Sequence, residues 1–143
     1  MNKYIPSTSK WVRDQVELYE KSNGAEGNTV FDFPVMIVTN LGRKSGAIRK
    51  TPLITVKDGD RYVLIASQGG SPKHPNWYYN LRANPIVKIQ DGSTIYDMKV
   101  TEIIDSKERK RLWDIAVKTY SHYQDYQNRT ERMIPIFLAV PIK

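Results

Sequence analysis

The sequence contains no cysteine and only two histidines, His74 and His122. Without cysteine, disulfide bonds and thiolate chemistry are excluded. Neither histidine lies in an HExxH segment and no carboxylates are paired at ligand spacing, so we expect no metal site. The motifs GxSxG, GxGxxG and GxxxxGK(S/T) are also missing. Their absence removes the usual signals of a hydrolytic triad, a dinucleotide site and a nucleoside triphosphate site.

Long apolar runs are absent as well. No segment approaches the roughly 18 apolar residues of a membrane-spanning helix. The first twenty residues lack the apolar run of a signal peptide. The 143 residues suffice for one domain with its own core, and no repeat or linker divides them. We therefore expect a single domain over 1–143 in a cytoplasmic protein, with a helix and lead-in over 1–30 and a barrel over 31–143. Association with a membrane surface is left open.

Acidic residues are scarce in one contiguous span, from Phe33 to Gln90. This span holds nine Lys and Arg residues but only two acids, Asp58 and Asp60, so it carries the whole net charge of +7. The remaining residues are electrically balanced. A positive excess confined to one region favours an anionic partner, such as nucleic acid, an acidic membrane or a phosphorylated small molecule.

Local patterns predict three helices and about six strands. Val12, Val16 and Tyr19 share one face of the first helix. The helices are expected over 9–22, 74–84 and 106–120, the last capped by Ser106. The strands are expected over 34–39, 51–57, 61–67, 86–90, 94–104 and 133–140. Asp-Gly turns predict two hairpins, 51–57 with 61–67 and 86–90 with 94–104. Hairpin connections favour an α+β fold with a small, mostly antiparallel barrel.

Two glycine-containing loops in the basic span have the composition of an anion-binding site. "GRKSG" (42–46) combines two glycines, a hydroxyl and two cations, and Arg49 and Lys50 follow at the start of the next strand. "SQGGSPK" (67–73) supplies two hydroxyls, flexible glycines and Lys73. Either loop alone is compatible with a solvated turn. Their joint position in the basic span favours an anion site formed by backbone N–H groups and cationic side chains.

Three tyrosines, Tyr120, Tyr123 and Tyr126, are spaced three residues apart. On a helix or helical turn they would line one side. Their neighbours are polar, and a buried tyrosine hydroxyl needs a partner. A core stripe and the wall of a pocket for a flat ligand both remain open.

Three segments together resemble the deazaflavin-dependent nitroreductase family: "TNLGRKSGAIRKTPL", "ASQGGSPKHPNWYYNLRANP" and "YSHYQDYQNRTERMIPI". The resemblance covers roughly residues 34–137, with the motifs in order. It implies a split β-barrel with flanking helices, related to flavin reductases. It further implies an oxidoreductase that transfers a hydride from reduced coenzyme F420 to a quinone, a nitro compound or a similar conjugated acceptor.

The resemblance also implies roles for individual residues. Arg43, Lys44 and Arg49 would bind the phosphate and the acidic, glutamate-containing tail of the coenzyme, and Trp77 would help to shape its site. The implied cofactor-binding residues are Arg43, Lys44, Ser45, Arg49, Thr51, Pro52, Ser67, Gln68, Gly69, Gly70 and Trp77. The implied catalytic residues are Tyr120, Tyr123 and Tyr126, on the acceptor side, and Ser67, which would lie against the deazaflavin ring system.

The sequence departs from the family pattern at two positions. Ile54 follows "TPL" where a pocket tyrosine is expected in the nitroreductase, and Gln68 stands where a lysine is expected. Ile54 changes the pocket wall, so the reduction of nitro compounds does not carry over. Gln68 removes one cation directed at the coenzyme. The family is expected, and the acceptor is left open.

Two other functions remain open. An FMN-binding split-barrel oxidoreductase would account for one basic loop, because FMN carries one phosphate and no acidic tail. A nucleic-acid-binding barrel, with Trp77, Tyr78 and Tyr79 as stacking aromatics, is less favoured because the cations gather beside glycines in loops. We therefore expect a small-molecule electron acceptor as partner and no nucleic acid. A homodimer is left open, since split-barrel relatives often dimerise.

Overall fold

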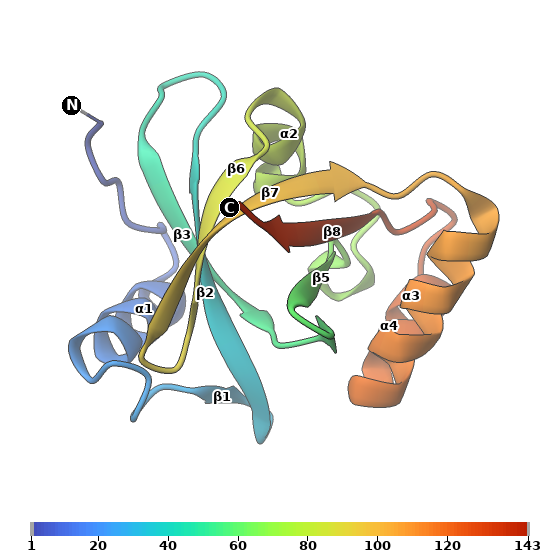
Figure 1. The fold of residues 1–143 in the computed structure, drawn as a ribbon, viewed down its shortest axis with the longest axis horizontal. Coiled ribbons are helices and arrows are strands. Elements are labelled where there is room, and N and C mark those ends of the chain that lie inside the picture. The colour runs from blue at the N-terminus through green and yellow to red at the C-terminus, as the bar shows by residue number, and fades with distance from the viewer. Residues whose placement is uncertain (1, 143) are drawn as a thin grey trace.

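In a computed structural model, which describes residues 2–142, the chain forms a curled antiparallel sheet flanked by helices (Figure 1). The sheet order is β1-β2-β6-β7-β8-β5-β4, and β3 pairs with β2 off this path. The strands are β1 (Thr29–Val30), β2 (Phe33–Leu41), β3 (Ile48–Ile54), β4 (Lys57–Asp58), β5 (Arg61–Ile65), β6 (Ile86–Asp91), β7 (Thr94–Glu102) and β8 (Ile136–Pro141). The helices are α1 (Lys10–Lys21), α2 (Asn76–Ala83), α3 (Ser106–Thr119) and α4 (His122–Asn128), with a 3₁₀ turn η1 (Gln68–Gly70).

The α+β class and the mostly antiparallel sheet are confirmed. The sheet of residues 2–142 has eight strands rather than about six. The difference comes from β1 and β4, which have two residues each and are too short to leave a periodic pattern. The strand expected over 133–140 begins later, at Ile136.

The long strand β2 separates two hydrophobic clusters. Because side chains alternate along a strand, Met36 and Val38 pack into the cluster inside the curled sheet, together with Leu64, whereas Val35 and Ile37 face α1. All five side chains are at most 3% exposed. The first helix is therefore fixed to the outer side of β2, as the pattern of its apolar residues predicted.

Tyr19 fastens α1 to the sheet. Its side chain is 1% exposed. Its hydroxyl donates to the Gln90 carbonyl at 3.2 Å and accepts from the Gly92 N–H at 2.7 Å. Burying such a side chain contributes about 1.5–3 kcal/mol. Together with buried Val16, this contact holds α1 beside the turn between β6 and β7.

The first predicted hairpin is wrong in extent. Residues 51–54 belong to β3, which pairs with β2 in a seven-residue register from Val35–Ile54 to Leu41–Ile48. Only β4 pairs with β5, through two residue pairs. Most of β5 pairs with β8 instead. The second predicted hairpin, β6 with β7, is confirmed.

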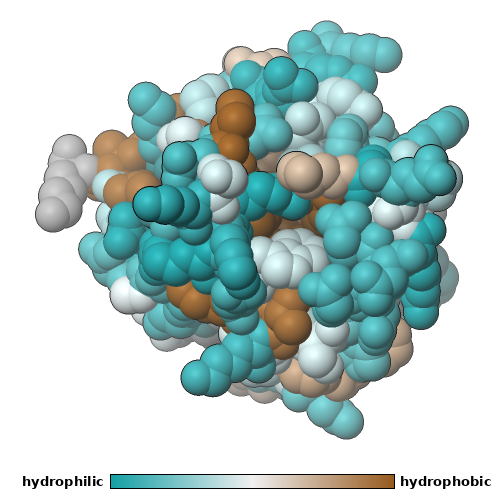
Figure 2. Space-filling model, turned by 90° about the vertical axis from the view of Figure 1, so that its right-hand side faces the viewer, coloured by the Kyte–Doolittle hydropathy of each residue, from teal (hydrophilic) through white to brown (hydrophobic). Residues whose placement is uncertain are grey.

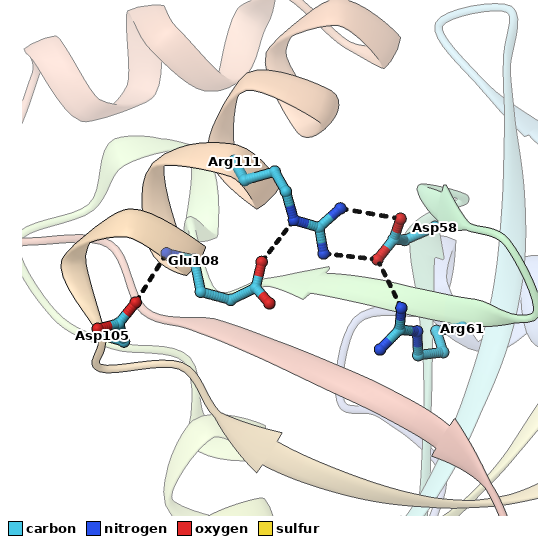
Figure 3. A network of polar contacts seen from close by, with 5 residues as sticks. All are labelled: Asp58, Arg61, Asp105, Glu108 and Arg111. Carbon is cyan, nitrogen blue, oxygen red and sulfur yellow. Dashed lines mark hydrogen bonds and ion pairs between the residues drawn. The ribbon is translucent and has the colours of Figure 1, made fainter.

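Helix α3 is capped by Asp105 rather than by Ser106. The Asp105 carboxylate accepts a hydrogen bond from the Glu108 N–H at 3.0 Å. One turn later, Arg111 donates to both carboxylate oxygens of Asp58, at 3.1 and 2.9 Å, and Arg61 adds an ion pair at 3.6 Å. Figure 3 shows this chain of contacts from the start of α3 to the turn between β4 and β5. The network fixes α3 against the sheet.

The face that carries α3 and α4 is mainly hydrophilic, and hydrophobic residues show there only in small areas (Figure 2). Among residues 2–142, no helix has both the length and the apolar character needed to cross a membrane.

Candidate functional site

A cleft of about 800 Å³ lies between β3, the loop 42–46, η1, α2 and the tyrosines before and within α4. Its volume falls within the range of ligand-binding sites. Every residue predicted to be catalytic lines it, and so does every predicted cofactor residue except Gly70. The predicted residues that meet here are Arg43, Lys44, Ser45, Arg49, Thr51, Pro52, Ser67, Gln68, Gly69, Trp77, Tyr120, Tyr123 and Tyr126.

One end of the cleft is cationic. Arg43, Lys44 and Arg49 line it, and none of them has a carboxylate partner among residues 2–142. Their neighbour Lys50 is different, because its ammonium group pairs with Glu20 of α1 at 2.6 Å. The crowded basic segment thus presents three uncompensated positive charges to the cleft.

Ion pairs elsewhere in the span 33–90 neutralise most of its other cations. Of the nine cations between Phe33 and Gln90, five have acidic partners within 4.0 Å, namely Lys50, Lys57, Arg61, Arg82 and Lys88. In the described part of the chain, the cations of this span without such a partner are Arg43, Lys44, Arg49 and Lys73. Of these four, only Lys73 does not line the cleft. The remaining positive potential is therefore concentrated where an anion would bind.

The basic loop has a fixed shape. Asn80 of α2 accepts from the Arg43 N–H at 3.0 Å and from its guanidinium at 3.3 Å, and the Arg43 guanidinium lies 5.0 Å from the ring centre of Tyr79. Within the loop, the Ser45 hydroxyl accepts from the Ala47 N–H at 3.1 Å. Asn80, which the sequence reasoning missed, therefore orients the first cation of the site.

The N-terminal segment also supports this loop. Lys3 accepts from the Ile48 N–H at 2.8 Å, and Ile5 donates to the Ile48 carbonyl at 3.0 Å. Asn2 donates to the Gly46 carbonyl. The segment thus runs beside β3 and covers part of its edge, which restrains the loop that carries Lys44.

The second predicted loop approaches the cleft through Ser67, Gln68 and Gly69. The Ser67 side chain is 8% exposed, and no hydrogen bond of its hydroxyl occurs within residues 2–142. Gly70 lies behind the loop, with φ of +82°. A Cβ atom there would lie 2.7 Å from the Tyr126 carbonyl oxygen. Gly70 therefore serves close packing against α4 and does not line the cleft.

The three tyrosines gather on the opposite wall, although they do not lie on one helix. Tyr120 follows α3, whereas Tyr123 and Tyr126 belong to α4. The Tyr120 and Tyr126 hydroxyls are 2.8 Å apart, and the Tyr120 and Tyr123 ring centres are 4.9 Å apart. The cluster packs on the core and also lines the cleft, so both sequence interpretations apply.

Burial gives these tyrosines high pKa values. Desolvation, followed by the hydrogen bond to Tyr126, raises the pKa of Tyr120 well above its usual value. Desolvation likewise raises the pKa of Tyr123. Both hydroxyls therefore remain protonated at neutral pH. The Tyr123 hydroxyl makes no hydrogen bond within the described residues, so it is available as a donor to a ligand.

The part of the cleft next to α1 is apolar, and the sequence reasoning missed most of it. Its walls include Val12 of α1, Leu53 and Ile54 of β3, and Phe31. Phe31 is 74% exposed and has φ of +51°, which is uncommon for a residue other than glycine. No sequence pattern marks Phe31 as part of a pocket. The cleft thus joins a cationic end to an apolar end lined by tyrosine hydroxyls.

Comparisons with known proteins identify the family of this chain. The family model described as F420H(2)-dependent quinone reductase matches residues 11–141. The F420H(2)-dependent quinone reductase Rv1261c of Mycobacterium tuberculosis is 34% identical over 122 residues, which cover 83% of this chain and 82% of the relative.

Two solved structures are also similar to this chain. One, described as a domain-swapped dimer, is 40% identical with a TM-score of 0.73, and the match covers 94% of this chain and 100% of the other. Another, described as an F420-H2 dependent reductase (FDR-A), is 42% identical with a TM-score of 0.70, and the match covers 75% and 94%. These likenesses confirm the predicted split β-barrel. The chain therefore belongs to the F420H(2)-dependent quinone reductase family, a family of oxidoreductases whose cofactor is coenzyme F420.

Proposed function

We propose that this protein is an oxidoreductase that uses reduced coenzyme F420 to reduce a quinone. The observation that carries the proposal is the division of the cleft. Three unpaired cations, Arg43, Lys44 and Arg49, stand at one end, and apolar side chains with buried tyrosines line the other. A cofactor with a polyanionic tail and a flat ring matches the first end, and an apolar ring compound matches the second.

The residues present fit this cofactor. Cation–phosphate and cation–carboxylate hydrogen bonds are among the strongest in proteins, and Arg43, Lys44 and Arg49 have no competing acid among the described residues. Ser67 and Trp77 also line the cleft. They would contact the ring system and fix its orientation. An FMN phosphate would engage only part of the cationic end.

Bound reduced F420 supplies a hydride. The protein's own task is to hold the two rings together and to exclude water. A quinone oxygen gains negative charge as its ring accepts a hydride. The free hydroxyl of Tyr123, protonated because of its raised pKa, would donate a hydrogen bond to that oxygen and stabilise the charge. Ser67 is a second donor at the cleft.

The apolar wall favours a quinone over a nitro compound. Ile54 offers no hydrogen-bond donor, and it stands beside Leu53 and Val12. Burying a polar nitro group against this wall without a partner costs free energy. A quinone places only its two carbonyl oxygens where donors are needed, and its ring and substituents contact the apolar side chains.

The test is anaerobic mixing of the purified protein with reduced F420 and a short-chain naphthoquinone. We expect protein-dependent oxidation of reduced F420 with quinol as product, faster than with a nitroaromatic compound at equal concentration. Reduced FMN is used in parallel. Oxidation of reduced FMN without oxidation of reduced F420 would show that FMN, and not F420, is the cofactor. Absence of oxidation with both would contradict the proposed activity.

We further propose that the protein is a homodimer. The similar structure described as a domain-swapped dimer is matched over 94% of this chain, at 40% identity. Sedimentation equilibrium should give twice the 16.5 kDa of one chain. A single-chain mass over the whole concentration range would contradict the dimer.

We also propose that the exposed side of α1 contacts anionic membrane surfaces. Trp11 and Leu18 are 60% and 43% exposed and line one shallow groove, and Phe31 is 74% exposed. Such aromatic and aliphatic side chains insert at bilayer interfaces, and the net charge of +7 favours acidic lipids. Cosedimentation with phosphatidylglycerol vesicles should fall for the double variant Trp11→Ser and Leu18→Ser. The control Ile104→Ser removes an apolar side chain beyond β7 that is even more exposed, at 83%. Equal binding by all three proteins would contradict the proposal.

A further inference from the structure

Arg132 lies behind the loop that leads from β5 into the cleft. Its guanidinium donates to three backbone carbonyls: to Ser71 at 2.8 Å, to Ser67 at 2.7 Å and to Ala66 at 3.2 Å. It also lies 3.0 Å from Nδ1 of His74. A single side chain therefore joins both ends of the segment 66–71 to His74, which lies two residues before the start of α2.

The segment needs such support because its backbone is strained. Gln68, Gly69 and Gly70 have φ of +45°, +63° and +82° in succession. Gln68 is not a glycine, so the left-handed conformation is unfavourable for it. Within residues 2–142, few other contacts act on this loop: the Ala66 N–H donates to the Pro135 carbonyl at 3.0 Å, the Arg129 guanidinium reaches the Gly69 carbonyl at 3.5 Å, and Gly70 packs on α4. The guanidinium of Arg132 is thus the main polar restraint on the backbone that Ser67 and Gln68 present to the cleft.

We propose that Arg132 is a positioning residue that holds residues 66–71 in the shape needed for cofactor binding, and that His74 makes this restraint dependent on pH. Arginine can only donate hydrogen bonds. Nδ1 of His74 must therefore accept, so the ring is neutral with its proton on Nε2. When His74 binds a second proton, an N–H faces the guanidinium and two positive charges adjoin. The restraint then weakens.

The groups around His74 agree with a neutral ring. Arg132 and Arg82 are the nearby cations, and Glu102 is the nearby acid. The ring centres of Tyr78 and Tyr79 lie 4.3 and 5.9 Å from that of His74. Desolvation, then the charge of Arg132, lowers the pKa of His74, and Glu102 opposes this only in part. The ring is therefore neutral at pH 7 and gains its proton below about pH 6.5, its ordinary pKa.

The first measurement needs no cofactor. Hydrogen exchange of the amides of residues 66–71, followed at pH 7 in the free protein, should accelerate about tenfold or more in Arg132→Gln. Arg132→Lys should be intermediate, because one ammonium group cannot reach three carbonyls. Arg109→Gln is the matched control. Arg109 is also a half-buried arginine bonded to a carbonyl, that of Ile134, but among the described residues it makes no hydrogen bond to the loop. We expect it to change the melting temperature and not the exchange of residues 66–71.

The second measurement concerns binding, and it rests on the proposed function. The Kd for coenzyme F420 should rise about tenfold in Arg132→Gln at pH 7. In the wild-type protein, both the Kd and the loop exchange, expressed relative to the intrinsic amide exchange rate at each pH, should increase as the pH falls from 7 to 5.5. His74→Asn keeps an acceptor near Nδ1 but does not titrate. It should bind F420 as the wild type does at pH 7 and should lose this pH dependence.

The outcomes separate the two proposals. Unchanged loop exchange in Arg132→Gln would overturn the role of Arg132, whatever the cofactor. A wild-type protein that does not bind F420, but whose loop exchange depends on Arg132, would contradict the proposed function and leave the restraint itself supported. A pH dependence that persists in His74→Asn would overturn the role of His74.

Discussion

The four cations between Arg43 and Lys50 differ in their availability to a ligand, because their ion-pair partners differ. Lys50 is neutralised by Glu20 and also contacts the Tyr4 ring, at 4.9 Å from its centre. Arg43, Lys44 and Arg49 keep their charge for a ligand, and Asn80 orients Arg43. A salt bridge on the surface contributes little to stability. At the residue scale, the pairing of Lys50 therefore matters mainly because it neutralises one basic side chain at the cleft and joins it to α1.

The hydroxyl of Tyr123 should contribute to catalysis without titrating. Removing one donor to a developing negative charge lowers kcat by roughly 10²-fold in other enzymes, and we expect a loss of about that size in Tyr123→Phe. Because burial raises the pKa of Tyr123, its hydroxyl stays protonated, and kcat should show no loss from this group up to about pH 10. Steady-state kinetics from pH 7 to 10 measure both effects.

Tyr120→Phe is the matched control for that variant. It removes a hydroxyl that already shares a hydrogen bond with the Tyr126 hydroxyl. We expect a smaller loss of kcat than in Tyr123→Phe. The reverse order would reassign the donor to the Tyr120–Tyr126 pair.

Gly70→Ala should disturb the cleft although Gly70 does not line it. The added Cβ would lie 2.7 Å from the Tyr126 carbonyl oxygen, on a backbone with φ of +82°. The loop or α4 must then shift, so the Kd for F420 should rise severalfold and the melting temperature should fall by several degrees. Gly69→Ala meets no atom within 4 Å of its Cβ and carries a similar φ, +63°. Comparison of the two variants therefore separates the effect of the steric clash with α4 from the effect of the strained backbone. Equal effects of the two variants would show that the contact with α4 is unimportant.

At the scale of elements, periodicity predicted helices better than strand partners. The helices expected over 9–22 and 106–120 end within two residues of α1 and α3, because their apolar spacing is local information. The segment 51–57 was assigned to the wrong hairpin, since its pairing with β2 depends on where the intervening basic loop closes. Nothing in an Asp-Gly turn reveals that β5 will pair with β8, more than sixty residues later.

In the candidate site too, the sequence predicted local features and missed contacts between distant residues. Glycines, cations and tyrosines marked the two loops and the aromatic cluster, and nearly all of these residues line one cleft. The side chains that position them were missed: Asn80 bonds to Arg43 across 37 residues, and Arg132 bonds to Ser67 across 65. A single sequence holds no local signal for such contacts. The predicted N-cap of α3 was wrong by one residue, since the cap is Asp105 and not Ser106.

The network between α3 and the turn of β4 and β5 should stabilise the fold above acidic pH. Hydrogen bonds from Arg111 lower the pKa of Asp58, with desolvation acting in opposition. A depressed pKa means that this contribution is present above the ordinary value of 3.8 and is lost as the pH falls through the folded-state value. Arg111→Gln should therefore lower the melting temperature by about 2–4 °C at pH 7.

Scans of thermal unfolding at pH 7 and at pH 2.5 check this prediction. The difference between Arg111→Gln and the wild type should shrink at the lower pH, because pH 2.5 lies below the ordinary Asp58 pKa of 3.8, where the contribution of the lowered pKa declines. Lys110→Gln is the control, because within residues 2–142 Lys110 pairs only with Asp114, on its own helix. A difference that is the same at both pH values would assign the stability to packing of the Arg111 side chain.

At the scale of the whole molecule, one cleft has a cationic end that suits the coenzyme and an apolar end that suits the electron acceptor. The curled sheet places β3 and its basic loop on one wall and the Tyr120–Tyr126 segment on the other (Figure 1). Five ion pairs remove most of the positive charge of the span 33–90 and leave it focused at the cleft. The net charge of +7 therefore matters less than where the unpaired part of it lies.

The measurement that tests this account most directly is a fluorescence titration of the protein with coenzyme F420, carried out on the wild type, Arg49→Ala and Lys73→Ala. Both residues are cations without an acidic partner among residues 2–142, but Arg49 lines the cleft and Lys73 does not. We predict that Arg49→Ala raises the Kd about tenfold or more, through loss of a charge-assisted hydrogen bond. Lys73→Ala should leave the Kd nearly unchanged. Equal Kd values for all three proteins, or the larger effect in Lys73→Ala, would contradict the assignment of the cationic end of the cleft to the coenzyme.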